Sequence, residues 1–331
     1  MSINENCKLK IENFLNMLAT RLSPYLKNLT KKCPAIYRQF VPSSKEKKAE
    51  MVTSDDPLLE EHYTVTRGLV HKYGNRALIL LTMNCAAYCR FCTRRRKVSD
   101  IEKGRLSDQD IENMVNYVKA HPEIKELLFS GGDPSTVPVL LKKVLRKFVK
   151  LPQIKIIRVA SRLPVSNPAM VNKQLLDALK VVKKQPLYLM VHFEHPAEIT
   201  PEAIKAVKKL QKVATMLLNQ SIFLKGVNDD VEILYELFSR LVEIGIKPYY
   251  LYRCDPVRGA EGFIVPFKRE VEIFTQLRKR LSGLAVPAYV IDAPNGAGKI
   301  PAPLNFWNFD HENYQDFNGK KLRVVEGESR L

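Results

Sequence analysis

The feature that most constrains the fold is a regular alternation of short apolar runs with amphipathic segments, which begins near residue 76. The helical segments start with clear signals, such as Ser107 ahead of an acidic turn and Thr200 followed by Pro201 and Glu202. This alternation is typical of parallel strands joined by right-handed crossovers. Six or seven strands are few for a closed eight-stranded barrel, so we expect an open or partial barrel, with a doubly wound sheet as the alternative. The expected strands span residues 77–84, 126–131, 154–161, 187–193, 215–221, 247–254 and 287–293.

Polar residues follow the carboxyl end of every expected strand. These ends meet along one rim in a parallel sheet, where ligands of such folds bind. Each residue alone is compatible with a helix cap or a turn, but together they predict a binding site. They are Cys85, the turn Gly131-Gly132-Asp133-Pro134, Ser161, Arg162, His192, His195, Asn219, Gln220, Asp255 and Asp292.

Three cysteines, Cys85, Cys89 and Cys92, lie in the stretch NCAAYCRFCTRRRK directly after the first expected strand. A disulfide would leave one thiol over, and a zinc ion would need a fourth ligand from elsewhere in the chain. Three thiolates can hold a [4Fe–4S] cluster and leave one iron open to a small ligand, which suits catalysis. We therefore interpret the C-x₃-C-x₂-C spacing as an iron–sulfur site.

The chain of 331 residues carries a formal net charge of +18. Such a charge suits a polyanionic partner such as RNA, but the lysines are spread through the expected helices, which favours a lysine-rich surface over nucleic-acid binding. No window is apolar enough to span a membrane, and the first residues contain no secretory signal pattern. Together with the clustered cysteines, these features predict a protein of the reducing cytoplasm.

The cysteine spacing and the GGDP turn resemble the radical S-adenosylmethionine (SAM) superfamily. Further stretches, in order from about residue 67 to 303, resemble the lysine 2,3-aminomutase family: CRFCTRRR, FSGGDP, SRLPV, HFEHPAEIT, KGVND, KPYYLYRCD and DAPNGAGKIP. The resemblance implies a partial (β/α)₆ radical SAM barrel whose open iron binds SAM. The expected SAM contacts are Gly131, Gly132, Asp133, Pro134, His192 and Gln220, with the glycines allowing the backbone a close approach.

The resemblance also implies pyridoxal 5′-phosphate (PLP), bound as a Schiff base to a lysine beside the pocket. Lys299 matches that lysine; the family usually has glycine where Asn295 stands, a change that a left-handed backbone tolerates. The stretch GAGK lacks the spacing of a nucleotide-binding loop. Lys72 keeps the positive charge of the arginine that the family usually has there, but it lacks the planar guanidinium that can donate two parallel hydrogen bonds to a phosphate. The expected phosphate contacts are Lys72, Tyr73 and Arg76, just before the first expected strand, and Arg162.

Substrate binding is implied by three charged residues. Arg94 matches the arginine that grips the amino-acid carboxylate, and Asp255 and Asp292 match the pair that holds the distal ammonium of lysine. The implied reaction moves the 2-amino group of L-lysine to C3 and gives β-lysine. Arginine would satisfy the same charges, whereas a glutamate-acting relative would need cationic or neutral groups in place of both aspartates.

Several expectations concern organisation and partners. We expect an N-terminal helical cap and linker over residues 1–66, a core barrel over 67–303 and a tail over 304–331. Longer family members carry a cysteine-rich C-terminal segment that binds zinc and helps assembly. Because no cysteine follows Cys254, we expect no zinc, and a homo-oligomer stays open. The resemblance implies a reductase, flavodoxin or ferredoxin as electron donor.

Two pathways and two rival functions remain. The length resembles the branch that makes β-lysine for modifying elongation factor P, while CTRRR resembles the catabolic or osmolyte branch. An RNA-modifying radical SAM protein would explain the positive charge but should lack Lys299 and the paired aspartates. A zinc-binding interaction domain would explain the cysteines but not the polar residues at the strand ends.

Overall fold

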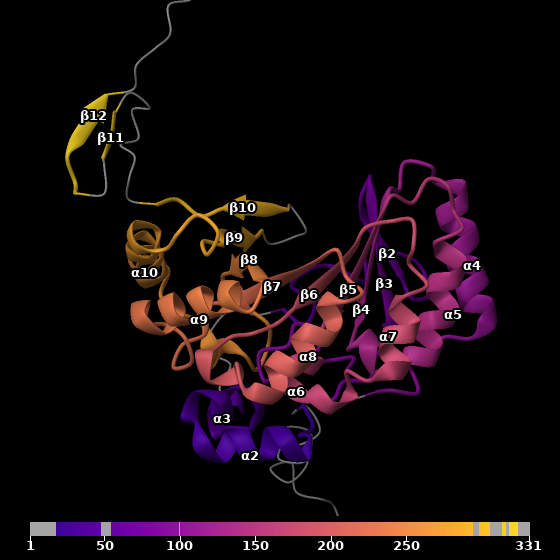
Figure 1. The fold of residues 1–331 in the computed structure, drawn as a ribbon, viewed down its shortest axis with the longest axis horizontal. Helices are drawn as coiled ribbons and strands as arrows, with labels where there is room; N and C mark the ends of the chain where they lie inside the picture. The colour runs from indigo at the N-terminus through magenta and orange to yellow at the C-terminus, as the bar shows by residue number, and fades with distance from the viewer. Residues whose placement is uncertain are drawn as a thin grey trace, which may run out of the picture.

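Ten strands of the computed structural model form one sheet, in which the strands follow each other in chain order from β1 to β10 (Figure 1). The structure describes residues 18–47, 54–98, 100–293, 298–304, 313–315 and 318–323. The seven strands from β3 to β9 run parallel to one another. The sheet consists of β1 (Thr64–Thr66), β2 (Leu69–Tyr73), β3 (Arg76–Thr82), β4 (Glu126–Gly131), β5 (Ile156–Ser161), β6 (Leu187–Val191), β7 (Met216–Ile222), β8 (Ile246–Tyr252), β9 (Ala288–Asp292) and β10 (Lys299–Pro301). A separate hairpin pairs β11 (Asn313–Gln315) with β12 (Lys321–Arg323).

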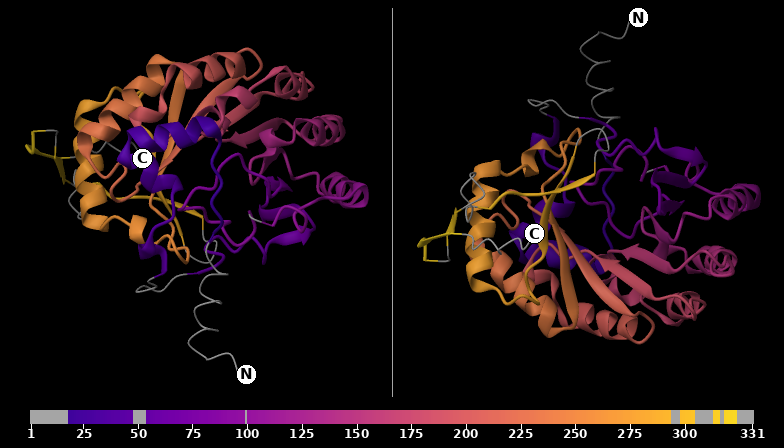
Figure 2. Two further views of the ribbon diagram at one scale, coloured as in Figure 1. Left: turned by 90° about the horizontal axis from the view of Figure 1, so that it is seen from below. Right: turned by 90° about the horizontal axis from the view of Figure 1, so that it is seen from above.

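Helices cover the outside of this curved sheet, as both end views show (Figure 2). The sheet stays open because its edge strands β1 and β10 do not pair with each other. Six helical crossovers separate the seven parallel strands, which confirms the predicted partial (β/α)₆ barrel. The doubly wound alternative is wrong, because its strand order would reverse within the sheet.

The helices form where the sequence signals predicted them. Ser107 caps α4 in a reciprocal capping box with Asp110, and Thr200 caps α8 through the backbone N–H of Ala203. Each helix buries one apolar face against the sheet, as Leu141, Val144 and Phe148 do in α5. The crossover helices are α4 (Asp108–Ala120), α5 (Pro138–Phe148), α6 (Leu163–Ser166), α7 (Lys173–Leu179), α8 (Pro201–Gln211), α9 (Val231–Glu243) and α10 (Phe267–Arg280). Short 3₁₀ turns follow several strands: η2 (Pro134–Thr136), η3 (Pro168–Met170), η4 (Pro196–Glu198) and η5 (Glu261–Phe263).

Antiparallel strands at both edges of the sheet were not predicted. Lys72 and Tyr73 belong to β2, and Arg76 begins β3, so these residues form a hairpin instead of preceding the first strand. At the other edge Lys299 begins β10, which pairs with β9. Strands of three to five residues are too short to show the periodicity on which the prediction rested.

The N-terminal cap, residues 18–47, lies across the carboxyl ends of the parallel strands (indigo in Figure 1). It comprises α2 (Pro24–Lys32), α3 (Pro34–Phe40) and η1 (Ser44–Lys47). Ser23 donates a hydrogen bond to the carbonyl of Ser166 after β5, and the hydroxyls of Tyr25 and Thr200 lie 2.6 Å apart. The predicted N-terminal helical cap falls partly outside the described residues, and within them its first helix begins at Pro24. The domain boundaries at 66 and 303 stay predictions.

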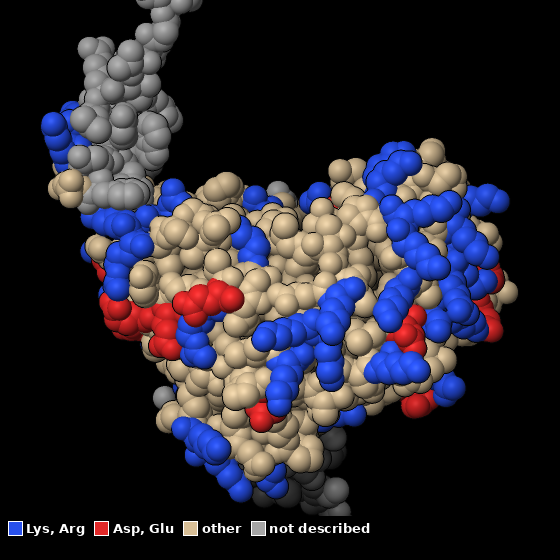
Figure 3. Space-filling model, in the orientation of Figure 1, with Lys and Arg blue, Asp and Glu red and all other residues tan. Residues whose placement is uncertain are grey.

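Positive charge lies largely on the outer helices. In Figure 3 lysines and arginines cover the side of the molecule formed by α4, α5 and α7. These residues include Lys119, Lys143, Arg146, Lys150, Lys173 and Lys180, all of them exposed. This surface lies on the opposite side of the sheet from its concave face. In the part of the chain that the structure describes, no helix has the length and apolar character of a membrane span.

Candidate active site

The cysteine loop, residues 85–98, leaves the carboxyl end of β3 and lies against the cap. The backbone N–H of Arg90 donates to the carbonyl of Gln39 in α3 at 2.8 Å, and that of Tyr88 donates to the carbonyl of Arg21 at 3.2 Å. Phe91 is buried in a small apolar cluster, against which Cys89 packs. The cap therefore fixes the backbone of the loop that carries the three predicted cluster ligands.

The thiols of Cys85, Cys89 and Cys92 are free and interact electrostatically. Burial, and after it the neighbouring Cys89, raises the pKa of Cys92 to about 11. Two N–H groups oppose this effect, because a donor to sulfur stabilises the thiolate. Nη1 of Arg162 donates to Sγ of Cys89 at 2.8 Å, and the backbone N–H of Arg94 bonds to Cys92.

These features fit a cluster better than a single ion. Among the residues that the structure describes, no three His, Cys, Asp or Glu side chains are arranged around one ion. Three interacting thiols, two of which accept hydrogen bonds from N–H groups, are compatible with a [4Fe–4S] site held by three thiolates. The assignment of Cys85, Cys89 and Cys92 as cluster ligands stays a prediction that this geometry supports.

The arginines of the cysteine loop are paired with acids that the sequence did not suggest. Arg94 binds the carboxylate of Glu60 through Nε at 2.9 Å and Nη2 at 2.6 Å, and its Nη1 donates to Ser130 and to the carbonyl of Gly131. Glu60 is 5% exposed. Arg94, which is predicted to bind the carboxylate of the substrate, is thus already paired with an acid of the protein. It lies beside the GGDP turn.

Arg90 and Arg95 share a second acid. Both guanidinium groups bind Glu46 of η1, with Nη2 of Arg95 at 3.0 Å, and Arg90 is fully buried. Arg96 pairs with Asp56 at 2.9 Å. The arginines of the loop therefore form ion pairs within the protein: those with Glu46 attach the loop to the cap, and those of Arg94 and Arg96 attach it to the segment that carries Asp56 and Glu60.

The GGDP turn lies so close to the end of β3 that side chains cannot fit. A Cβ on Gly131 would lie 2.3 Å from the carbonyl oxygen of Thr82, and one on Gly132 would lie 2.4 Å from that of Asn84. Gly131 also has a φ of +117°, which favours glycine. Pro134 begins η2 directly after this turn. The glycines thus have a packing reason that does not depend on SAM, whose contact with this turn stays a prediction.

Asp133 anchors the same turn to β5. Its carboxylate accepts hydrogen bonds from the backbone N–H groups of Ser135 at 3.0 Å and Arg162 at 2.8 Å, and from Oγ of Ser161 at 3.1 Å. Burial raises the pKa of Asp133 to about 6, although these donors act in the opposite direction. The carboxylate of Asp133 therefore holds the GGDP turn next to Arg162, the residue that contacts Cys89.

A buried acidic pair lies beside His192. Burial, followed by the positive charge of Arg162, lowers the pKa of His192 to about 4, so its ring is neutral at pH 7. Its Nδ1 lies 3.6 Å from the buried carboxylate of Glu194. Glu198, also fully buried, accepts hydrogen bonds from Gln39 and Arg162. Both glutamates occur in the quoted stretch HFEHPAEIT, but the sequence prediction assigned them no role.

A second group of polar side chains, the lysine group, consists of Lys72, Tyr252, Asp255, Asp292 and Lys299. Nζ of Lys299 binds both carboxylate oxygens of Asp292, at 2.7 and 2.8 Å, and lies 5.1 Å from the centre of the Tyr252 ring. The β9–β10 hairpin aligns the two residues directly opposite each other. The loop at 294–297, which contains Asn295, lies outside the described residues.

Asp255 is the least satisfied charge of the lysine group. Burial, and then the negative charge of Asp292, raises its pKa to about 7, while Lys299 and Lys72 lower it. Within the described residues its carboxylate has no hydrogen bond or ion pair. The structure therefore brings together Asp255 from the stretch KPYYLYRCD and Asp292 and Lys299 from the stretch DAPNGAGKIP.

Gln220 and Arg162 lie with other neighbours than expected. Gln220, predicted to contact SAM, donates from Nε2 to the hydroxyl of Tyr252 at 3.1 Å and so borders the lysine group. Arg162, predicted to bind the PLP phosphate, contacts Sγ of Cys89. The roles of Gln220 at SAM and of Arg162 at the PLP phosphate stay predictions.

Cations and aromatic rings on β2, β3 and β5 border the same group. The guanidinium of Arg76 lies 4.0 Å from the ring centre of Tyr73, and Nζ of Lys72 lies 5.4 Å from it. Arg158, which the sequence prediction missed, has a buried Nε without a partner in the described part of the chain. The positive charges of Arg158 and Arg76 both act to lower the pKa of Tyr250, against the larger effect of burial. An unpaired buried donor among cations fits a phosphate.

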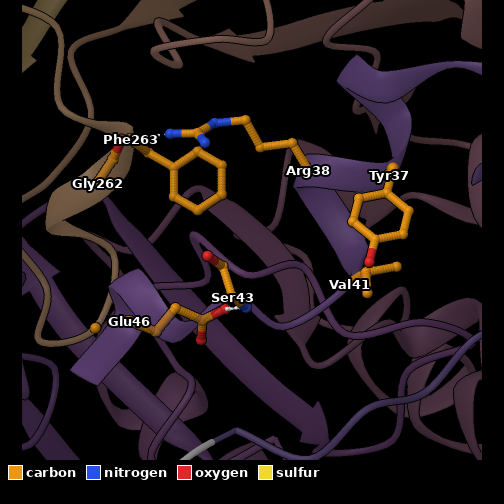
Figure 4. Close-up of a pocket in the computed structure, with 8 residues that line it drawn as sticks. Tyr37, Arg38, Val41, Ser43, Glu46, Gly262 and Phe263 are labelled. Carbon is orange, nitrogen blue, oxygen red and sulfur yellow. Dashed lines mark hydrogen bonds between the residues drawn. The ribbon is translucent and has the colours of Figure 1, made fainter.

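One surface pocket opens between the cap and η5 (Figure 4). It has a volume of about 140 Å³, and its lining includes Tyr37, Arg38, Glu46 and Phe263. The ring of Phe263 packs edge-on against that of Phe91, with centres 5.7 Å apart. None of the predicted site residues lines this pocket, but its wall contacts the cysteine loop.

Comparison with known proteins places the chain in a class. Residues 79–238 match the Radical SAM superfamily, and this segment carries the cysteine loop, the GGDP turn and the strands from β3 to β7. The curved parallel sheet with cysteines after its first parallel strand thus belongs to a radical SAM enzyme. A radical SAM methyltransferase from Sphaerobacter thermophilus is similar over 67% of this chain and 68% of its own, with 17% identity and a TM-score of 0.45.

Curated relatives narrow the class to a family. The L-lysine 2,3-aminomutase of Methanococcus maripaludis is 36% identical over 98% of this chain and 76% of its own length. That of Clostridium subterminale is 37% identical over 82% of this chain and 65% of its own length. The chain belongs to the lysine 2,3-aminomutase family, and it spans about two thirds to three quarters of the length of these relatives.

Proposed function

We propose that the protein is a PLP-dependent radical SAM aminomutase that moves the 2-amino group of L-lysine to C3. The observation that carries this proposal is the lysine group, in which two aspartates converge beside Lys299. Two carboxylates and one amine fit a site that holds a cofactor through the amine and a cationic side chain through the acids. The named relatives support the substrate class.

At one end of the site, Cys85, Cys89 and Cys92 would hold a [4Fe–4S] cluster and the GGDP turn would contact SAM. Together these groups supply a carbon radical able to remove hydrogen, and PLP supplies a conjugated ring that delocalises the unpaired electron. The residues of the chain bind, orient and exclude water around them. The cap contributes to exclusion, because it lies across the strand ends where the cysteine loop begins.

At the other end, Lys299 would hold PLP, with Lys72, Tyr73, Arg76 and Arg158 near its phosphate. The ammonium of Lys299 forms an ion pair with the carboxylate of Asp292 in this structure. When Lys299 is bonded to the cofactor it no longer presents that ammonium, so Asp292 becomes available to another cation. Asp255, which has no partner in the described residues, would share that cation, and the ammonium of a lysine substrate meets both requirements.

Arg94 is proposed to bind the substrate carboxylate. Glu60 already holds its guanidinium, so the substrate must compete with that acid or bind to the remaining N–H of Nη2. The proposal includes a reductase, flavodoxin or ferredoxin as electron donor and a cytoplasmic location. Arginine is the second substrate to test, because its side chain also carries a positive charge.

The test is anaerobic purification with reconstitution of iron, sulfide and PLP. We expect iron–sulfur absorbance, a PLP band near 420 nm that disappears in Lys299→Ala, and conversion of lysine to β-lysine that this variant abolishes. Lys299 lies on the edge strand β10, whose three residues are all exposed, so the variant should fold normally. Cys33→Ser, at the end of α2, is the control that should keep both cofactors.

Each outcome has a distinct meaning. Turnover of arginine or glutamate in place of lysine would change the assigned substrate but leave the proposed type of reaction unchanged. Cluster and SAM cleavage without a PLP band would contradict the aminomutase proposal and favour the RNA-modifying rival. A colourless zinc protein would overturn the whole assignment.

A further inference from the structure

Among the residues that the structure describes, Arg162 is the one charged side chain that donates a hydrogen bond to a thiol of the cysteine loop. It follows β5, and its Nη1 donates to Sγ of Cys89 at 2.8 Å. No other side-chain donor to these three thiols occurs among the described residues. A guanidinium directed at sulfur is suited to a thiolate that carries negative charge, as a cluster ligand does.

The guanidinium is held rigidly by two fully buried side chains. Nη2 donates to Oε1 of Gln39 and, at 3.1 Å, to Oε1 of Glu198; Gln39 in turn donates to Glu198 at 2.8 Å. The plane of the group also lies 4.6 Å from the ring centre of Phe40. Gln39 and Phe40 belong to α3 and Glu198 to η4, so the position of Arg162 depends on the cap and the barrel together.

One donor of Arg162 is left over. Its Nε is buried and has no partner in the described part of the chain. A buried unpaired N–H is costly, and such groups in native proteins usually have a ligand or water to bond. Because Nη1 of the same planar group already reaches Cys89, a sulfur-rich anion at the cysteines would lie within reach of this side chain.

We propose that Arg162 is a positioning residue that holds the Cys89 thiolate and raises the reduction potential of the cluster. This inference rests on the proposed function, since it requires a [4Fe–4S] cluster at the cysteines. Reduction adds one electron from the external donor to the cluster and makes it more negative. A fixed positive hydrogen-bond donor stabilises the reduced cluster more than the oxidised one, because attraction grows with charge. The fold thereby makes the electron easier to accept.

The test is an anaerobic potentiometric titration of the reconstituted cluster, followed by electron paramagnetic resonance, in Arg162→Gln and Arg162→Lys. We expect Arg162→Gln to disfavour reduction by about tenfold, which for one electron is about 59 mV toward lower potential. Arg162→Lys keeps the charge but loses the fork, so its shift should be smaller. The readout is the potential and needs no turnover.

The matched control is Arg95→Gln. Arg95 lies in the cysteine loop and is nearly as buried, but its guanidinium bonds Glu46 and the carbonyl of Arg90 and no thiol. We expect its potential to shift by less than half as much. Equal shifts in the two Gln variants would overturn the proposal, because they would report general charge and not the bond to Cys89. An unchanged potential in Arg162→Gln would do the same.

Failure of the proposed function can be told apart from failure of this inference. If the wild-type protein assembles no cluster, the proposed function fails first. If only Arg162→Gln fails to hold the cluster, Arg162→Lys and Gln39→Ala carry the test. Gln39→Ala leaves the cation in place without its clamp, so we expect a downward shift smaller than that of Arg162→Lys; an upward shift in either variant would contradict the proposal.

Discussion

The cysteine loop and the lysine group balance their charges in different ways. In the loop, each arginine is already paired within the protein: Arg90 and Arg95 with Glu46, and Arg94 with Glu60. In the lysine group, Asp292 is bound by Lys299, whereas the carboxylate of Asp255 has no hydrogen bond or ion pair among the described residues, although the charges of Lys299 and Lys72 act on it. In the first region the acids and arginines are paired with each other, whereas the second keeps one carboxylate without a direct partner.

The difference indicates what each region does. A region that holds a permanent group benefits from a rigid frame, and buried ion pairs with full hydrogen bonding supply geometry rather than net stability. A region that binds and releases a cation must keep an acid unpaired, at a cost to the free protein. We therefore expect the change from acid to amide to have opposite effects in the two regions.

The largest effect is expected for Glu46→Gln. This change removes the acid that neutralises Arg90, which is fully buried, and Arg95. Breaking a buried pair by removing one partner costs about 3–5 kcal/mol, so the free energy of unfolding should fall by about that amount. Urea denaturation of the protein without cofactors measures it. A loss below about 1 kcal/mol would mean that these pairs do not form the frame of the loop.

A smaller effect of opposite sign is expected for Asp255→Asn. The pKa of Asp255 in the folded protein, about 7, lies above its value of about 3.9 in an unfolded chain. The folded state therefore binds the proton more tightly, and the ionised carboxylate costs stability as the pH rises from about 4 to above 7. The full shift would correspond to about 4 kcal/mol, but Asp255 is only partly buried and solvent screens its charge. We therefore expect the free energy of unfolding of the variant to exceed that of the wild type by about 1–2 kcal/mol at pH 8, and to equal it at a pH below both pKa values.

The same variant should bind lysine at least about tenfold more weakly at pH 8, because one of two partners of the ammonium is lost. Equal stability of variant and wild type across this pH range would show that Asp255 is not an unpaired buried acid. Isothermal titration with the PLP-loaded protein, in the absence of SAM, measures the binding.

The smallest effect is expected for Glu232→Gln, which supplies the baseline for the comparison. Glu232 pairs with Arg280 between α9 and α10, with side chains 70% and 39% exposed. Exposed pairs contribute about 0–1 kcal/mol, so the free energy of unfolding should change by less than about 1 kcal/mol at any pH. A larger loss would place this surface pair in the same class as Glu46.

The fold was largely predictable because its signals are local. The run ALILLTMN predicted β3, and Ser107 and Thr200 predicted the starts of α4 and α8, since strand and helix periodicity and capping act within a few residues. The hairpin that carries Lys72, Tyr73 and Arg76 was missed because its strands are short and antiparallel. The resemblance identified Lys299, Asp255 and Asp292 as neighbours, and the structure places them together.

The partners of the cysteine loop could not be predicted from sequence patterns. Gln39 is 159 positions from Glu198, and Glu60 is 34 positions from Arg94. Such contacts depend on which loops the fold brings beneath the cap, and a glutamate that will be buried looks like any other glutamate in the sequence. Arg162 shows the same limit: the sequence identified it as a cation of the site, but its contacts with Gln39 and with the thiol of Cys89 come from distant parts of the chain.

The position of the cap has a consequence for synthesis of the chain. Tyr25 and Arg38 emerge from the ribosome early, yet their hydrogen-bond partners follow 175 and 187 positions later, and a further partner of Arg38 follows 224 positions later. Contacts over such separations form late, because loop closure must precede them. The N-terminal segment therefore has no place to dock until most of the barrel exists, so the cysteine loop stays uncovered by the cap during that interval.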